Sequence, residues 1–271
     1  MKANLKSISC LLCLSASALI LSACGSSSDP EPKPEPKTAS INSANYSDVL
    51  GIAAGSTDQS EGLIRAGLAP IAVGFTQTQP GSLACVDGGS LDLSIADKLR
   101  TYTAVNCKTG PVFIASGTLT ESVDSPDGLS RSVKIKDLNL RTSDTDLTMQ
   151  KVNGDLKVSV KADGTPVSAV IDLSVLRNAR TDTFALTLDA SGNLMVVIDT
   201  SRFPQKLVIT GDAKTNSVKI SSRGDGSSLT AIESADGKTY ILELREPGNA
   251  TPVLTKTITA AELEAWVKKA L

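Results

Sequence analysis

Cysteine is the residue with the greatest chemical potential in this 271-residue chain, which contains five cysteines and no histidine. Cys10 and Cys13 have the CxxC spacing of redox and metal sites, but they lie in an apolar N-terminal run that offers no folded context. Cys24 follows that run directly, whereas Cys85 and Cys107 stand in the body of the chain. The five thiols therefore form three groups, and each group has a different expected fate.

The lack of histidine limits the chemistry of the chain. It removes the commonest general base, the nitrogen ligand of many zinc and copper sites, and Ser-His-Asp or Cys-His nucleophilic sites. The loop 124–128 contains two carboxylates, but it lacks the alternating oxygen ligands and terminal Glu of a calcium loop. We therefore expect no catalytic residues, no metal and no cofactor, and we predict that the chain is not an enzyme.

The first 24 residues have the order of a lipoprotein signal. Lys2 and Lys6 precede an apolar run, Ile8–Leu21, that is too short to cross a bilayer core of ~30 Å as a helix. The run ends in the sequence Leu-Ser-Ala-Cys at positions 21–24, which resembles the lipobox of bacterial lipoproteins. That resemblance implies a signal peptide over 1–23, cleavage before Cys24, and acylation of Cys24 with diacylglycerol and palmitate-like chains.

The same resemblance predicts where the mature protein is held. In the Gram-negative sorting rule, aspartate after the lipidated cysteine retains a protein in the inner membrane, and here that position is Gly25. We expect a lipid anchor in the outer membrane, on its periplasmic face. Two or more acyl chains make such attachment stable. Residues 24–40, rich in Pro and Ser, are predicted to be a flexible tether.

Composition limits the partners of the mature chain, which has 271 less 23, or 248, residues. Of the 27 basic residues, Lys2 and Lys6 leave with the signal, so 25 remain against 29 acidic ones. A mildly acidic chain without basic clusters argues against nucleic acid as a partner. We expect membrane contact through the lipid, and either an envelope protein or an apolar ligand as the partner.

The pattern from about Leu83 to Leu254 predicts a mainly β protein with minor α content. Thr, Ser and Val are abundant, apolar and polar residues frequently alternate, and most turn signals are about 10 to 17 residues apart, which is typical of an antiparallel meander. We expect one domain over 41–271, with a long sheet that is curved or partly barrel-like, packed by helices at about 44–55, 61–69 and 260–270. Predicted turns include Ala96-Asp97, Lys108-Thr109-Gly110, Pro126-Asp127-Gly128, Asn153-Gly154, Asp163-Gly164, Ser191-Gly192-Asn193, Gly224-Asp225-Gly226, Asp236-Gly237 and Pro247-Gly248.

Three local patterns refine this expectation. A change in the parity of apolar residues predicts a β-bulge near Lys136-Asp137. Thr259 and Glu262 have the spacing of a capping box, and Trp266 lies on the apolar face of the helix that follows. We predict that Trp266 is a core anchor. The tripeptide Arg223-Gly224-Asp225 matches an adhesion motif, but its turn residues favour a plain exposed turn.

Cys85 and Cys107 remain as an even pair in an oxidising periplasm, so we predict a disulfide between them. If strands 85–95 and 98–107 pair about Ala96-Asp97, the two cysteines lie opposite each other. That register places Leu91, Leu93, Ile95, Leu99 and Val105 on the cysteine side, and Asp92, Ser94 and Tyr102 on the other face.

The surroundings of these cysteines resemble a group of uncharacterised proteobacterial β-rich lipoproteins. The shared features are a cysteine, a glycine pair and a strand, here residues 85–90, and later an Asn-Cys followed by glycine, here residues 106–110. The group has no established activity, so the resemblance implies none.

Two functions fit these features. The first is a structural or interaction module of the cell envelope, displayed on a tether. The alternative is a periplasmic carrier or receptor for a lipid or other apolar ligand, because a curved sheet closed by helices is similar in architecture to lipoprotein carriers of the Lol type. A carrier should leave part of an apolar sheet face unfilled, whereas an interaction module should have a solid core.

Overall fold

The structure is a computed structural model, which describes residues 40–57, 79–142, 144, 147–161, 166–189, 193–212 and 215–270. The predicted signal peptide, the acylated Cys24, nearly all of the tether and the predicted helix 61–69 lie outside the described residues. The predicted turns at Asp163-Gly164 and Ser191-Gly192 also lie outside them.

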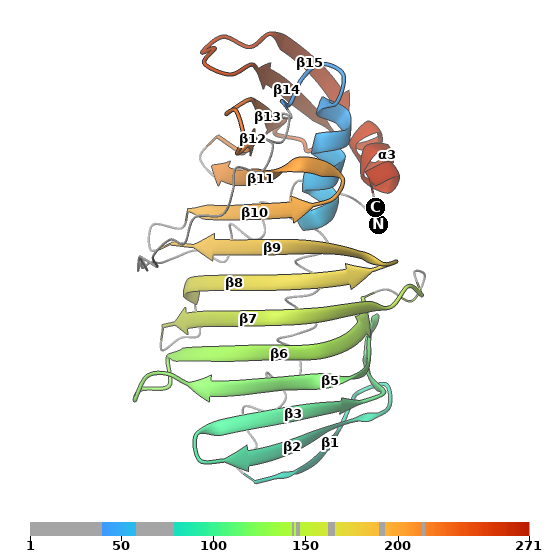
Figure 1. The fold of residues 1–271 in the computed structure, drawn as a ribbon, viewed down its shortest axis with the longest axis vertical. Coiled ribbons are helices and arrows are strands. Elements are labelled where there is room, and N and C mark those ends of the chain that lie inside the picture. The colour runs from blue at the N-terminus through green and yellow to red at the C-terminus, as the bar shows by residue number, and fades with distance from the viewer. Residues whose placement is uncertain are drawn as a thin grey trace, which may run out of the picture. The chain divides into compact units, whose positions relative to one another are not determined.

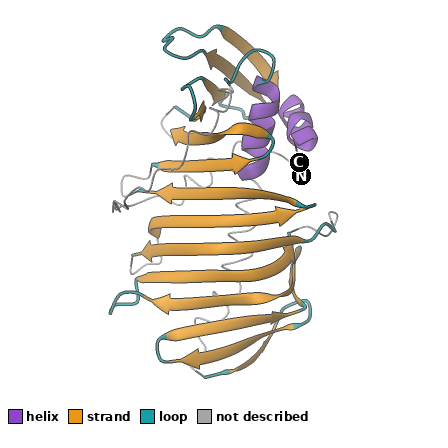
Figure 2. Ribbon diagram, in the orientation of Figure 1, coloured by secondary structure: helices purple, strands orange, loops and turns teal. Residues whose placement is uncertain are grey.

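The chain is mainly β, and its strands follow one another in the sheet almost in chain order (Figure 1). The order runs from β1 to β15 with antiparallel neighbours wherever the register is described, and β4 lies beside β5 off this path. The sheet is open, since β1 and β15 stand at its two ends. The predicted mainly β fold, with a long antiparallel meander and a helix near each end, is therefore confirmed (Figure 2).

The contacts of the chain separate it into two compact units. We call Ser56–Thr187 the middle unit, and we call the residues up to Gly55 together with Leu188–Leu271 the terminal unit. The expectation of a single domain stays a prediction, and each unit is described by itself.

The middle unit is built from consecutive hairpins. Its strands are β1 (Gly81–Ala84), β2 (Ser90–Ala96), β3 (Leu99–Val105), β4 (Cys107–Thr109), β5 (Val112–Val123), β6 (Ser130–Arg141), β7 (Gln150–Val160), β8 (Pro166–Arg177) and β9 (Arg180–Leu188), which ends at the boundary.

One face of the middle unit is apolar. A single row of directly paired positions contains Leu93, Tyr102, Leu119, Ile135 and Leu173, and all five side chains are buried. Polar and charged side chains occupy the alternate positions on the outer face, as the two-residue period of a strand requires. This alternation is what the sequence pattern predicts.

Bulges interrupt two neighbouring strands of this unit, β5 and β6, at about the same level. The register shifts between Ile135 and Leu138 on β6, where Asp137 has φ 51°, so the bulge predicted there is confirmed. The prediction of a turn at Asn153-Gly154 is wrong, because both residues lie within β7. Asn153 instead supports the bulge by accepting a hydrogen bond from the Asp137 amide (2.7 Å). Gly154 is required because a Cβ there would lie 2.0 Å from the Asp172 carbonyl oxygen.

The terminal unit combines six strands with two helices. The strands are β10 (Leu194–Thr200), β11 (Phe203–Asp212), β12 (Ser217–Ser222), β13 (Ser228–Glu233), β14 (Thr239–Arg245) and β15 (Leu254–Thr259). The helix over 46–57, which we call the N-terminal helix, lies beside α3 (Ala260–Ala270) in Figure 1. The predicted turns at 224–226, 236–237 and 247–248 all connect consecutive strands of this unit.

The two helices approach each other closely. A Cβ added at Gly51 would lie 2.5 Å from the Trp266 carbonyl oxygen, so only glycine allows this contact. The Lys269 ammonium forms an ion pair with Asp48 (2.7 Å) across the same contact. Residues 49–57 are all buried, which indicates that the N-terminal helix is covered on every side after its first turn.

The capping box at the start of α3 is confirmed. The Thr259 amide donates to the Glu262 carboxylate (2.8 Å), and the Glu262 amide donates to the Thr259 hydroxyl (3.2 Å). The hydrogen bonds that the Glu262 carboxylate accepts from the Thr259 amide and hydroxyl lower the pKa of Glu262 below its ordinary value. At the other end, the Arg202 guanidinium donates to the Ala270 carbonyl (2.5 Å) and satisfies a terminal acceptor of the helix.

Candidate functional site

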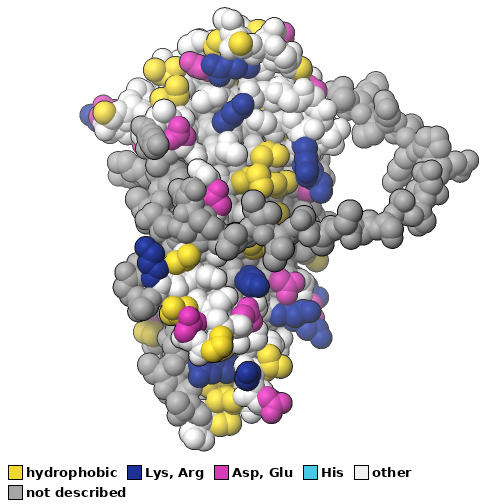
Figure 3. All heavy atoms as spheres, turned by 90° about the vertical axis from the view of Figure 1, so that its left-hand side faces the viewer, with side chains coloured by type: hydrophobic (Ala, Val, Ile, Leu, Met, Phe, Trp, Pro, Cys, Tyr) yellow, Lys and Arg dark blue, Asp and Glu magenta, His cyan; other side chains and the backbone are white. Residues whose placement is uncertain are grey.

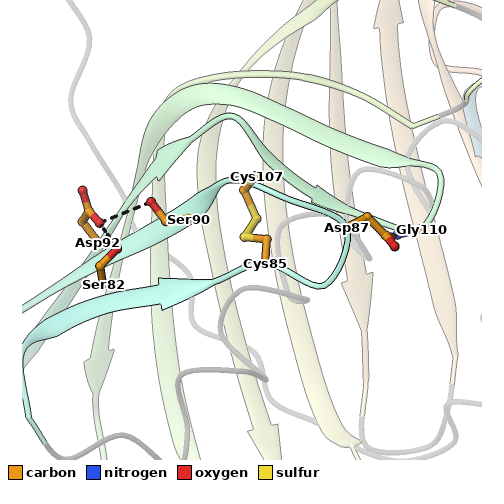
Figure 4. The surroundings of a disulfide bond; sticks show 7 residues. All are labelled: Ser82, Cys85, Asp87, Ser90, Asp92, Cys107 and Gly110. Atoms are coloured by element: carbon orange, nitrogen blue, oxygen red, sulfur yellow. Dashed lines mark hydrogen bonds between the residues drawn. A yellow bond between two sulfur atoms is a disulfide. The ribbon is translucent and has the colours of Figure 1, made fainter.

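The predicted disulfide between Cys85 and Cys107 is present, with Cα atoms 5.5 Å apart (Figure 4). Cys85 directly follows β1, and Cys107 begins β4. Two backbone amides after Cys107 donate to the loop that follows Cys85: the Lys108 amide to the Gly88 carbonyl (2.8 Å), and the Gly110 amide to the Asp87 carboxylate (2.6 Å). The disulfide therefore joins two short segments that have few strand contacts of their own.

The hairpin register predicted around this disulfide is wrong. Leu99 pairs with Ala96 and Val105 pairs with Ser90, because the turn consists of Asp97 and Lys98 and is centred later than expected. The shift reverses the faces of the second strand. Leu99 and Val105 are 47% and 44% exposed. Tyr102, predicted to face outward, is instead buried. Leu91 and Leu93 keep their predicted face.

The corrected register brings Tyr102 to a buried ionic cluster. Glu121 on β5 is 1% exposed; its carboxylate accepts a hydrogen bond from the Tyr102 hydroxyl (3.3 Å) and forms an ion pair with Arg131 on β6 (2.6 Å). Burial, and next the charge of Glu121, raise the pKa of the Tyr102 phenol above its ordinary value. The phenol therefore stays protonated as a donor, which suits a structural role for this cluster.

The outer face of the middle unit contains a hollow of about 420 Å³, which lies over β3, β5, β6, β7 and β8. The strand register arranges its lining side chains in two rows. One row runs Leu99, Ser122, Ser132, Lys157 and Val170, and the other runs Thr120, Lys134, Asp155 and Asp172. We call these nine residues the outer hollow. Its volume falls in the range of small-molecule sites.

The outer hollow contains two lysines and two aspartates, so its net charge is zero. Lys134 lies directly opposite Asp155, and Asp155 lies directly opposite Asp172. Among the residues that the structure describes, none of the four charged side chains forms an ion pair with another. Like charges on directly opposite positions of a sheet destabilise it, so the two aspartates are an unfavourable arrangement without a cation between them.

Sequence reasoning missed the outer hollow. Its residues come from five strands, and only the register shows that they are neighbours. Figure 3 shows that charges of both signs are interspersed among the described side chains of the face that it presents.

Other predicted features have plain structural roles. Asp225 lies in the turn between β12 and β13, as expected, and its carboxylate accepts hydrogen bonds from the hydroxyls of Ser40 and Ser227. Burial by itself would raise the pKa of Asp225, but these hydrogen bonds outweigh burial, and the pKa is lowered from its ordinary value. The adhesion-like tripeptide is thus part of an internally bonded turn.

Trp266 is less buried than a core anchor would be. Its side chain is half-buried on α3 and meets Tyr46 edge to face, with ring centroids 5.8 Å apart. The Lys256 ammonium lies 5.6 Å from the indole centroid. Leu263 and Val267 are the buried residues of α3, so Trp266 covers the margin of the contact between the helices.

Two kinds of feature are absent from the described residues: a metal-binding cluster and a membrane-spanning helix. No cluster of three or more potential metal ligands occurs within those ranges. None of the helices there is long and apolar enough to span a bilayer.

Two comparisons of the chain with known proteins found no match. No protein-family model matches it, and no curated protein matches its sequence significantly.

Proposed function

We propose that the chain is an outer-membrane lipoprotein, anchored through Cys24, whose folded part serves in the periplasm as a non-enzymatic interaction module. The proposal joins the lipobox-like sequence at positions 21–24 to described residues whose large apolar side chains are buried and whose outer face is largely polar. The burial of these described side chains carries the choice of an interaction module over a carrier for an apolar ligand.

The interior of the terminal unit supports this choice. Leu207, Ile220 and Tyr240 on neighbouring parts of the sheet are 0% exposed, and the close approach of Gly51 to Trp266 leaves no space for a side chain between the helices. A carrier needs an apolar cavity of several hundred Å³ that its own side chains leave open. The described side chains of this unit are packed as in a core instead.

The middle unit offers a polar recognition surface. The outer hollow contains hydroxyl, ammonium and carboxylate groups, with apolar side chains only at Leu99 and Val170 and on the core-face residues below. Such a lining suits a polar ligand or a polar segment of a partner and is unsuited to an acyl chain.

The anchor is tested by metabolic labelling with radioactive palmitate. The wild-type protein should incorporate label and partition with membranes, and Cys24→Ala should do neither. Cys13→Ala is the matched control, because this cysteine lies in the signal segment and should not be acylated. Label in the Cys24→Ala variant, or none in the wild type, would refute the anchor.

The role is tested by native mass spectrometry of the purified protein in mild detergent. An interaction module should carry only the mass of its covalent lipid. A second, non-covalent lipid that resists removal would favour the carrier and overturn our proposal.

A further inference from the structure

We propose that the outer hollow binds a short peptide through its free ammonium and carboxylate termini. The inference rests on the proposed function only in taking the outer face of the sheet as the recognition surface. It starts from the four charged side chains that the hollow leaves unpaired.

The two aspartates form the expected cation subsite. Asp155 and Asp172 are directly opposite on β7 and β8, and Cβ atoms in such pairs are about 5 Å apart. Their mutual repulsion is relieved when a cation lies between the two carboxylates. Two carboxylates are too few for a calcium ion, which takes six to eight oxygen ligands, whereas an ammonium group with three donors suits them.

The two lysines form the complementary anion subsite. Lys134 on β6 and Lys157 on β7 are diagonal neighbours on the same face, since Lys134 pairs with Asp155 and Lys157 lies two residues further along the strand. Their ammonium groups can converge on one carboxylate. A ligand that has only a positive or only a negative group would leave one subsite unsatisfied.

The spacing of the subsites selects the length of the ligand. With strands about 4.8 Å apart and a rise of about 3.3 Å per residue, the midpoints of the two charge pairs are roughly 6 Å apart. An extended chain covers about 3.3–3.6 Å per residue, so two residues bridge the subsites, whereas three cover about 10 Å and are too long. A dipeptide also fits easily within about 420 Å³.

Apolar residues at the margins of the outer hollow favour peptides that have an apolar side chain. Leu99 and Val170 end one row, and they are 47% and 41% exposed. An apolar side chain of the peptide would cover part of this exposed surface. We therefore expect peptides with an apolar residue to bind more tightly than diglycine.

The experiment is a titration of the full-length, ¹⁵N-labelled protein in detergent with the dipeptide alanyl-leucine at low salt. Backbone amide shifts of β6, β7 and β8 should saturate with a Kd of about 1 mM, the affinity that a ligand of this size reaches at ordinary efficiency. N-acetyl-alanyl-leucine amide lacks both charges and should bind at least tenfold more weakly. Equal binding of the blocked dipeptide, or no saturable shifts, would overturn the proposal.

Variants locate the site. Asp172→Asn and Lys134→Gln should each weaken binding by about three- to fivefold, the usual effect of losing one exposed charge pair. Asp97→Asn and Lys219→Gln change exposed charges outside the hollow and should leave the Kd unchanged. Weakening by the control variants to the same degree would show only a general charge effect and would overturn the assignment.

The outcome separates this proposal from the proposed function. If Cys24 carries lipid and alanyl-leucine does not bind, the ligand class is wrong and the anchored module stands. If alanyl-leucine binds and Cys24 is not acylated, the site stands and the anchor fails. Saturable shifts at the same amides with maltose but not with alanyl-leucine would overturn the peptide in favour of a neutral sugar.

Discussion

Arg131→Met should strongly destabilise the protein, although the Arg131 side chain is partly exposed. Arg131 is the described cation that pairs with Glu121, whose carboxylate is almost fully buried beside Tyr102. Methionine keeps most of the volume of the arginine stem but removes the charge. The variant therefore leaves a buried carboxylate with the Tyr102 hydroxyl (3.3 Å) as its remaining described donor.

The magnitude follows from burial. Breaking a buried ion pair by removing one partner costs about 3–5 kcal/mol, because the remaining charge is uncompensated. The Arg131 side chain is 30% exposed, so water reaches its site and the lower end of this range applies. We expect a loss of about 3 kcal/mol, which corresponds to a fall in Tm of roughly 6–12 °C for a chain of this size.

The double variant Glu121→Gln with Arg131→Met is the decisive control. Glutamine keeps an acceptor for the Tyr102 hydroxyl and has no charge to leave unpaired, so the double variant should be about 2 kcal/mol more stable than Arg131→Met alone. Urea unfolding followed by circular dichroism measures all three proteins. If Arg131→Met costs less than about 0.5 kcal/mol, or if the double variant is no more stable than the single one, the reasoning fails.

Three further outcomes can be measured on the same protein. Reduction of the Cys85–Cys107 disulfide, whose cysteines are 22 positions apart, should lower the free energy of unfolding by about 3 kcal/mol, and an unchanged Tm would contradict this. The half-buried Trp266 should emit between the buried and free indole limits, and Trp266→Ala should cost about 2 kcal/mol, about half the loss at a fully buried tryptophan; emission equal to free indole would show that α3 is not docked. The lowered pKa of Glu262 means that its carboxylate stabilises the fold above its ordinary pKa and ceases to do so as the pH falls. The Tm advantage of wild type over Glu262→Gln should therefore shrink between about pH 5 and pH 3, and a constant difference would refute this.

The turns show how far the sequence predicts this fold. Pro126-Asp127-Gly128 and Asp236-Gly237 connect strands as expected, because Gly128 and Gly237 adopt the positive φ that their residue type signals. The turn between β8 and β9 was missed. It places Asn178 and Ala179 at φ 49° and 60°, and alanine gives no sign of that conformation.

The register between neighbouring strands could not be predicted from the sequence. The alternation in the β2–β3 hairpin is visible in the sequence, but the pairing of β3 with β2 is shifted by three residues from the predicted register, and an odd shift reverses the face of every residue in β3. The same limit hid the outer hollow, because Lys134, Asp155 and Asp172 become neighbours only after three strands are aligned. The depth of Trp266 was likewise unpredictable, because its partner Tyr46 comes from the opposite end of the chain.

The contact between Gly51 and Trp266 has a consequence for the order of folding. Nearly every strand pairs with one close to it in sequence, so hairpins can form as the chain emerges, with little loss of loop entropy. The N-terminal helix is made before any strand, yet its neighbour α3 is made last. The apolar surface of the N-terminal helix is therefore covered only after α3 has been synthesised. Until then this surface is exposed, and the nascent protein is prone to aggregation.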